Sequence, residues 1–237
     1  MLARGVADSV VVNQASPGQG DGTRAESPSE WPSTRVQGRV WPGEDPGPLG
    51  DLHGDAARVC GVLDDIGEPV ILVGHSYGGA VTEAGDHPMV DRLVYIAAFV
   101  LDAGESCMST AIGACMGRPN LAEGSVTGPD ETITLDPMIA AACLYNDCDD
   151  TTVGWAALRL GPHPLANLQQ EPMAVAWRTR PSTYVVYADD LVVHPELQRA
   201  QARRCTSTVE WPTGHLPFPS RPALVVNLLG ERATANE

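Results

Sequence analysis

The chain has 237 residues, of which 43% are apolar and 19% are charged, and its formal net charge at pH 7 is −15. This length and apolar content predict one domain with a sizeable core. The acidic balance argues against nucleic acids and anionic membrane surfaces as partners, because the densest basic cluster, residues 199–204, is typical of a solvated helix face. No charged and then apolar leader opens the chain and no apolar run reaches membrane-spanning length, so we expect a cytoplasmic protein.

Residues 1–50 form an atypical amino-terminal segment that is rich in Gly, Pro, Ser and Arg. Apart from the apolar run Val10-Val11-Val12, the segment has no sustained period of 2 or 3.6, so it predicts loop or disorder. Residues 51–237 carry the regular patterns of a folded domain. Apolar residues recur at helical spacing from Asp51 to Ile66, and Gly67 supplies a stop signal at the end of this helix.

The six cysteines lack C-x-x-C pairing and lie in a chain too large to depend on disulfides. They also show no zinc-ligand spacing with histidines. We therefore expect free thiols, and neither a metal nor an organic cofactor.

The most informative stretch follows the helix predicted to end at Ile66. An apolar run at residues 69–73 leads there into Gly74-His75-Ser76-Tyr77-Gly78. This is the G-x-S-x-G pattern of a sharp turn between a strand and a helix, with serine at its apex. A side chain two residues from the serine on either side would collide with the neighbouring backbone, and glycine removes that collision. The serine oxygen is then exposed at the carboxyl end of a strand, ready to act as a nucleophile.

The rest of the chain alternates strands and helices around one long insertion. A buried strand is predicted at residues 92–99, and the strand rhythm is then lost over residues 101–180, where two apolar helical patches suggest a cap. The later elements are a strand at 183–188, a helix at 195–204, a strand at 206–211 and a helix at 221–229. This order predicts an α/β fold with an open, mostly parallel sheet, helices on its faces and a helical cap insertion.

A serine nucleophile needs a base, which is itself oriented by a third group. His215 lies downstream of Ser76 in a loop that directly follows a short strand, so we predict that it is the base. The acid should follow the strand at 183–188, where Asp189 and Asp190 both stand, and Asp102 is a third candidate by spacing. An aspartate at a strand end is also a common turn or helix-capping residue.

The run from Val70 to Ser106 resembles the α/β-hydrolase superfamily, specifically small single-domain esterases similar to plant methyl-ester esterases, hydroxynitrile lyases and bacterial pyrethroid-type carboxylesterases. The sequences YNDC at 145–148 and SRP at 220–222, together with the His215 loop, also match bacterial members. In those relatives the acid is the second of an acidic pair, which corresponds to Asp190. The resemblance also implies that the backbone amide of Tyr77 is an oxyanion-hole donor and that residues 101–180 form a cap over the pocket.

The relatives begin with a strand that ends in His-Gly and whose loop supplies a second oxyanion amide, but no His-Gly occurs in residues 1–50. Val10–Gln14 is a candidate for a degenerate version of that strand. The sequence as a whole predicts a serine hydrolase that cleaves a small, apolar carboxylic ester. The alternatives are a lyase of the same fold and a catalytically impaired small-molecule-binding homologue.

Overall fold

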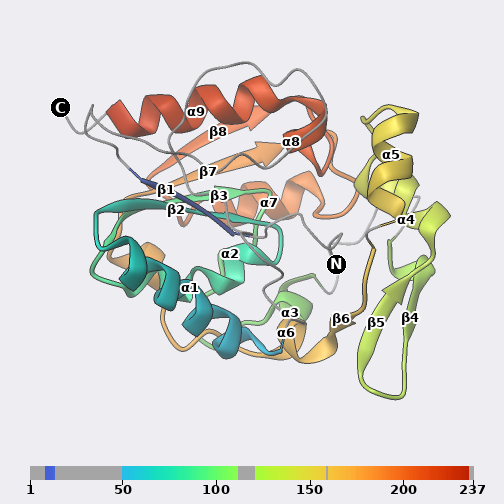
Figure 1. The fold of residues 1–237 in the computed structure, drawn as a ribbon, viewed down its shortest axis with the longest axis horizontal. Coiled ribbons are helices and arrows are strands. Elements are labelled where there is room, and N and C mark those ends of the chain that lie inside the picture. The colour runs from blue at the N-terminus through green and yellow to red at the C-terminus, as the bar shows by residue number, and fades with distance from the viewer. Residues whose placement is uncertain (1–8, 14–49, 112–120, 159, 235–237) are drawn as a thin grey trace.

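The centre of the computed structural model, which describes residues 9–13, 50–111, 121–158 and 160–234, is a five-stranded sheet (Figure 1). In spatial order the strands are β1 (Ser9–Asn13), β2 (Val70–His75), β3 (Val90–Ile96), β7 (Ser182–Tyr187) and β8 (Ser207–Trp211). Strands β2, β3, β7 and β8 are parallel, and β1 pairs with β2 in the antiparallel direction. This arrangement confirms the predicted mostly parallel sheet, with strand ends that differ from the predicted ones by no more than three residues.

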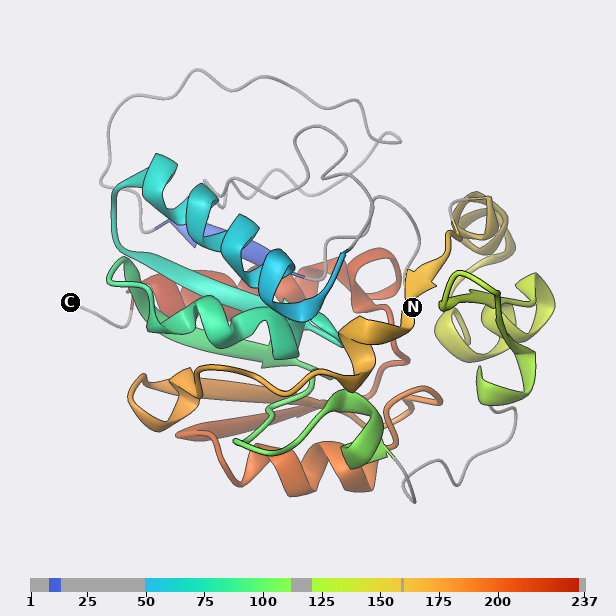
Figure 2. The same cartoon turned by 90° about the horizontal axis from the view of Figure 1, so that it is seen from below.

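Helices cover both faces of the sheet because successive strand residues point to opposite sides. On one face, Val70, Leu72 and their equivalents in β3 and β7 pack against the helices α1 (Leu52–Ile66), α2 (Gly78–Val81) and α7 (Pro195–Ala202). On the other face, Ile71, Val73 and their equivalents pack against α9 (Pro222–Thr234). Figures 1 and 2 show α1 and α2 lying across the first face, and α9 lying across the second.

The helices of the sheet layers are α1 (Leu52–Ile66), α2 (Gly78–Val81), the 3-10 helix η1 (Thr82–Asp86), α3 (Cys107–Ala111), α7 (Pro195–Ala202), α8 (Pro217–Ser220) and α9 (Pro222–Thr234). Helix α1 has the predicted ends. The Asp51 side chain accepts a hydrogen bond from the Gly54 N–H, and Gly67 adopts the left-handed conformation (φ 64°) and donates to the Leu63 carbonyl. No helix in the described part of the chain is long and apolar enough to span a membrane.

Most of the predicted cap lies beyond one end of the sheet, and it contains more than the predicted helices (Figure 2). Three short strands form a separate antiparallel sheet that the sequence did not predict, because strands of two to four residues are too short to show alternation. The elements of this part are η2 (Leu121–Gly124), β4 (Ser125–Thr127), β5 (Thr132–Leu135), α4 (Pro137–Leu144), α5 (Asp150–Ala157) and β6 (His163–Pro164). The last two elements of the predicted cap segment, α6 (Leu165–Gln169) and η3 (Ala176–Arg178), instead pack beside the helices of the sheet, and Ala176 belongs to the core cluster of the sheet.

The apolar side chains of the cap helices divide between two environments. Leu144 is buried in a cluster with Leu135 and Leu216, whereas Met138, Trp155 and Leu158 are exposed. The sequence pattern alone did not separate these two groups.

Strand β1 coincides with the apolar run that stands apart from the rest of the amino-terminal segment. Residues 9–13 form a strand, as the candidate at Val10–Gln14 suggests, and Ser9 pairs with Gly74 while Asn13 pairs with Val70. The chain therefore leaves β1 at the end of the sheet opposite Ser76. β1 itself therefore does not end beside the nucleophile turn, in contrast to the strand that the resemblance implies. Residues 1–8 and 14–49 of the predicted atypical segment lie outside the described residues.

Candidate active site

The turn that carries Ser76 has the strained geometry that its sequence predicts. Ser76 has a positive φ of 53°, which is uncommon for a residue other than glycine. Its N–H donates to the Ile96 carbonyl at 3.3 Å, and its own carbonyl accepts from Gly79 N and Phe99 N, each at 3.1 Å. A Cβ atom on Gly74 would lie 2.7 Å from the Gly78 carbonyl oxygen, so the turn requires glycine at this position.

His215 lies in the loop between β8 and α8 and reaches the nucleophile turn. Its Nε2 atom is 3.1 Å from Ser76 Oγ, and its Nδ1 atom is 2.8 Å from Asp190 Oδ2. Since a carboxylate only accepts, Nδ1 carries the proton, and Nε2 is left to accept from the Ser76 hydroxyl. The three side chains are buried, with Ser76 the most exposed at 5%. The arrangement allows a proton to move from Ser76 to His215 while Asp190 stabilises the charge that forms.

Asp190 follows β7 and is fixed by several donors besides His215. Its Oδ1 accepts from Val192 N at 2.7 Å and Val193 N at 3.1 Å, and its Oδ2 accepts from Gln198 Nε2 at 2.8 Å. Burial and, secondly, the negative charge of Asp190 raise the pKa of Tyr187 well above its ordinary value. The carboxylate is thus held in one orientation in a poorly solvated setting.

The other two candidate acids have different surroundings. Asp189 is exposed, and its backbone rather than its carboxylate bonds to the His215 loop, through its N–H to the Thr213 carbonyl at 3.2 Å. Asp102 forms an ion pair with Arg178, whose hydrogen bond lowers the pKa of that carboxyl. Within the described part of the chain, Asp190 is the one of the three that contacts His215.

His75 contributes a contact that the sequence analysis missed. Its Nε2 donates a hydrogen bond to the backbone carbonyl of His215 at 2.8 Å, and the two rings are 4.8 Å apart between centroids. Burial, and then the proximity of His215, lower the pKa of His75 well below its usual value, so the ring is neutral. The sequence identifies His75 only as a residue of the turn. Its contact with His215 leaves no local pattern, because the two residues are 140 positions apart in the chain.

The side chain of Tyr77 belongs to a second buried polar cluster. Its hydroxyl donates to Asp55 Oδ2 at 2.9 Å, while Asn167 Nδ2 donates to the Tyr77 hydroxyl at 2.7 Å and to Asp55. Burial raises the pKa of Asp55. His163 packs edge-on against the Tyr77 ring at 5.2 Å, and burial lowers its pKa to about 3. This cluster joins α1 and the cap to the nucleophile turn, whose Tyr77 backbone amide directly follows Ser76.

Among the described residues, no group of three or more His, Cys, Asp or Glu side chains could hold a metal ion.

The sequence profile described as the alpha/beta hydrolase family matches residues 2–228. The chain belongs to this family. It is 31% identical over 187 residues to the alpha/beta hydrolase nvfD of Aspergillus novofumigatus, and the alignment covers 72% of each chain. It is 27% identical over 179 residues to the probable hydrolase R7 of a Phoma species, which covers 70% of this chain and 71% of the relative.

Several solved structures of other proteins have the same fold as this chain. A pyrethroid hydrolase from Sphingobium faniae JZ-2 superposes with a TM-score of 0.68 at 21% identity, covering 79% of each chain. Polyneuridine aldehyde esterase gives a TM-score of 0.62 at 16% identity, covering 75% of this chain and 78% of the other. A methylesterase from Arabidopsis gives a TM-score of 0.60 at 19% identity, covering 78% of each chain.

Proposed function

We propose that the protein is a serine hydrolase that cleaves small carboxylic esters, with Ser76 as nucleophile, His215 as base and Asp190 as the residue that orients His215. The observation that carries this proposal is the continuous hydrogen-bonded chain from Ser76 Oγ through both nitrogens of His215 to Asp190 Oδ2. These three residues lie in three loops that follow three different strands, and yet their side chains are hydrogen-bonded to one another. A turn or capping role for the same residues would not require this arrangement.

The reaction follows from the placement of these groups. Ser76 Oγ attacks the acyl carbon while its proton passes to His215 Nε2, and the Tyr77 backbone N–H donates to the developing oxyanion. The imidazolium then protonates the leaving alcohol, and an acyl-enzyme ester remains on Ser76. In the second half, His215 takes a proton from water, the resulting hydroxide attacks the acyl carbon, and Ser76 recovers its proton as the carboxylic acid departs.

Two further observations support the substrate class. Leu216 directly follows His215 and is buried in the apolar cluster of the cap, so the environment of the proposed base is apolar on that side. The esterase and the methylesterase among the structures of the same fold have names that specify ester substrates. No metal or organic cofactor takes part in the proposed reaction.

The decisive experiment is labelling of the purified protein with a fluorophosphonate at neutral pH, followed by intact mass and peptide mapping. Ser76 Oγ displaces fluoride from phosphorus and His215 takes up the proton, so labelling reports an activated serine without knowledge of the substrate. We expect one adduct, on the Ser76 peptide, and a loss of at least about a thousandfold in labelling rate in Ser76→Ala and His215→Ala. Ser125→Ala, which removes an exposed serine of the cap, is the matched control and should label like the parent.

A series of p-nitrophenyl esters from acetate to octanoate then tests the substrate class. We expect kcat/KM to rise with chain length if an apolar acyl group is bound. A folded protein that stays unlabelled and inactive on every ester contradicts the proposal. Retained binding of an ester analogue by Ser76→Ala, with no turnover in the parent, would indicate the binding homologue instead.

A further inference from the structure

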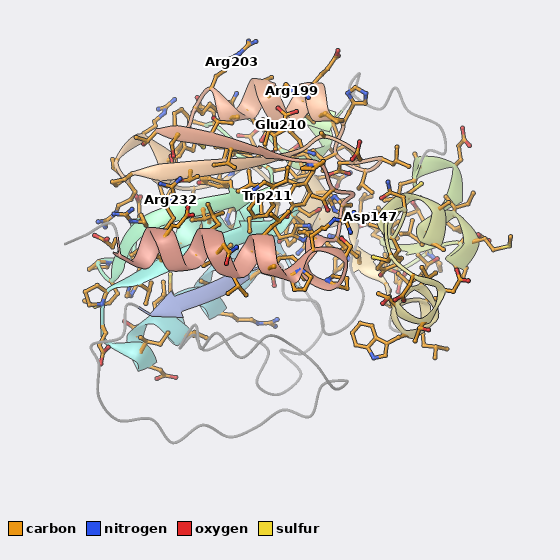
Figure 3. The ribbon with its side chains drawn as sticks, turned by 90° about the horizontal axis from the view of Figure 1, so that it is seen from above. Asp147, Arg199, Arg203, Glu210, Trp211 and Arg232 are labelled. Carbon is orange, nitrogen blue, oxygen red and sulfur yellow. The ribbon has the colours of Figure 1, made fainter. Side chains whose placement is uncertain are left out.

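The sequence YNDC at residues 145–148 lies in the cap between α4 and α5, and the reaction proposed above gives it no role. In the structure its aspartate reaches out of the cap to the loop of His215. Asp147 Oδ2 accepts hydrogen bonds from Thr213 Oγ1 at 2.9 Å, from Gly214 N at 3.0 Å and from Ser220 Oγ at 3.0 Å. These donors stand on both sides of His215 in the sequence. Figure 3 shows Asp147 at the junction between the cap and the sheet-bearing part of the molecule.

The neighbouring residue of the cap reaches the loop of the acid. Asn146 Nδ2 donates to the Asp189 carbonyl at 3.0 Å, directly beside Asp190. The two loops are also joined to each other, because Asp189 N donates to the Thr213 carbonyl. Adjacent cap residues therefore hold both the loop of the base and the loop of the acid.

The contact is closely packed as well as hydrogen-bonded. A Cβ atom on Gly214 would overlap the side-chain oxygen of Asn146 and would lie 2.8 Å from Asp147 Oδ1, so glycine is needed for the cap to approach this closely. Leu216, on the other side of His215, is buried in the apolar cluster of the cap. The His215 backbone is thus enclosed between two contacts with the cap, in addition to the hydrogen bond from His75.

We propose that Asp147 is a positioning residue that holds the His215 loop in the geometry needed for proton transfer from Ser76, with Asn146 doing the same for the loop of Asp190. The proposal rests on the function proposed above for Ser76, His215 and Asp190. Three hydrogen bonds to one carboxylate oxygen fix the loop on each side of the base, and charge-assisted bonds of this kind are stronger than neutral ones. A base displaced by about 1 Å is expected to lose about a hundredfold in rate.

The test compares Asp147→Ala, Asp147→Asn and Asp149→Ala by their fluorophosphonate inactivation kinetics over a range of reagent concentrations. Asp149 is the matched control, because it carries the same charge in the same segment but caps α5, accepting from Thr152 N at 2.7 Å. In Asp147→Ala we expect the limiting inactivation rate constant to fall by about 10- to 100-fold at an unchanged half-saturating concentration. Asp147→Asn keeps an acceptor oxygen and should restore most of the rate, whereas Asp149→Ala should lower the Tm and leave the rate unchanged.

Folded Asp147→Ala protein that reacts at the parent rate overturns the positioning role, as does an equal loss of rate in Asp149→Ala. If Asp147→Ala does not fold, Thr213→Val removes one donor to Asp147 without changing the cap. A parent-like inactivation rate in Thr213→Val would also contradict the positioning role.

A readout independent of reactivity separates the two proposals. The low-field proton resonance of the hydrogen bond between His215 Nδ1 and Asp190 should be present in the parent and in Asp149→Ala and broadened or lost in Asp147→Ala. If the parent does not react with the fluorophosphonate, the proposed function fails, while this resonance still decides whether Asp147 positions His215.

Discussion

The Nε2 atom of His75 lies 2.8 Å from the carbonyl oxygen of His215, so the residue before the proposed nucleophile supports the backbone of the proposed base. His75 ends β2 and His215 follows β8, and β3 and β7 separate these strands in the sheet. One hydrogen bond therefore connects the two loops whose separation determines the distance from Ser76 to His215. Because the pKa of His75 is lowered, the donor is a neutral imidazole.

Replacing His75 by Phe removes this hydrogen bond while preserving an aromatic ring. The buried His215 carbonyl is left without its donor, which costs about 1–3 kcal/mol of unfolding free energy. We expect this loss in urea denaturation, together with a fluorophosphonate labelling rate lowered by about 10-fold or more. His87→Asn is the control, since His87 lies in the turn between η1 and β3 and bonds to Asp64 and to Met89 N. Equal labelling rates in the two variants would show that His75 does not position His215.

His163 gives the stability of the protein a defined pH dependence. Its pKa is about 3 in the folded protein and near 6.5 in the unfolded chain, so below pH 6.5 the unfolded chain binds a proton that the folded protein does not. This contribution to stability is complete above pH 6.5 and is lost toward pH 3, by about 1.4 kcal/mol per pH unit. His163→Phe keeps a ring against Tyr77 and removes two buried nitrogens that have no hydrogen-bond partner among the described residues. We expect the variant to be at least as stable as the parent at pH 7.

The measurement is urea unfolding of parent and His163→Phe at half-unit steps from pH 7 to pH 5. The free energy of unfolding should fall more steeply with decreasing pH in the parent, by the equivalent of about one proton. The variant keeps the decline that the lowered pKa of His75 causes in the same direction. Parallel curves for the two proteins would mean that His163 is not held neutral by burial.

The sequence predicted those parts of the site that are encoded by local pattern and chain order. The turn at Ser76 is specified by glycines within two residues of it, and His215 and Asp190 are predicted because each follows a strand. The choice between Asp190 and Asp189 came from a resemblance, because both follow the same strand. The structure distinguishes them by burial, with Asp190 enclosed and Asp189 exposed.

The remaining features depend on tertiary contacts that leave no local pattern. Tyr77 and Asp55 are 22 positions apart, and Asn167 is 112 positions from Asp55, so only packing brings them together. The direction of β1 is likewise set by its pairing with β2, because an apolar run of three residues has the same sequence character in either orientation. The cap was predicted as an insertion, but its short strands pair through backbone groups that side-chain patterns do not reveal.

Tyr77→Phe tests whether the Asp55 cluster stabilises the fold through the tyrosine hydroxyl. The hydrogen bond from Tyr77 lowers the pKa of Asp55, which burial has raised overall, so its loss should raise that pKa further. A carboxyl with a raised folded-state pKa stabilises the fold below about pH 4 and loses that contribution as pH rises through the folded-state value. We expect Tyr77→Phe to be destabilised by about 1–3 kcal/mol, more at pH 7 than at pH 4.5.

The matched control for this prediction is Tyr145→Phe. The Tyr145 hydroxyl is also buried but has no hydrogen-bond partner among the described residues, so its removal should leave the unfolding free energy unchanged or slightly raised. Chemical denaturation at pH 4.5 and pH 7 gives both comparisons. A similar loss of unfolding free energy in the two variants would show that the loss in Tyr77→Phe does not come from the hydrogen bonds of its hydroxyl.

The glycines of the fold differ in whether they have space for a side chain, and this difference gives a paired prediction. A Cβ atom on Gly79, at the start of α2, would lie 2.5 Å from both the Ala98 Cβ and the Phe99 carbonyl oxygen. The backbone there is fixed by the bond from Phe99 N to the Ser76 carbonyl. We therefore expect Gly79→Ala to lose about 3 kcal/mol or more and to label slowly, since relief of the overlap moves the Ser76 turn.

Gly61, in the same layer of helices, has space for a side chain. It lies inside α1, and a Cβ atom there would have no atom within 4 Å. Alanine should stabilise the helix by about 0.5–1 kcal/mol without strain, and the labelling rate of Ser76 should stay at the parent value. Thermal unfolding and fluorophosphonate labelling of Gly79→Ala and Gly61→Ala test both expectations. A tolerated alanine at residue 79 with unchanged labelling would contradict the close packing of α2 on the strand end that supports the nucleophile.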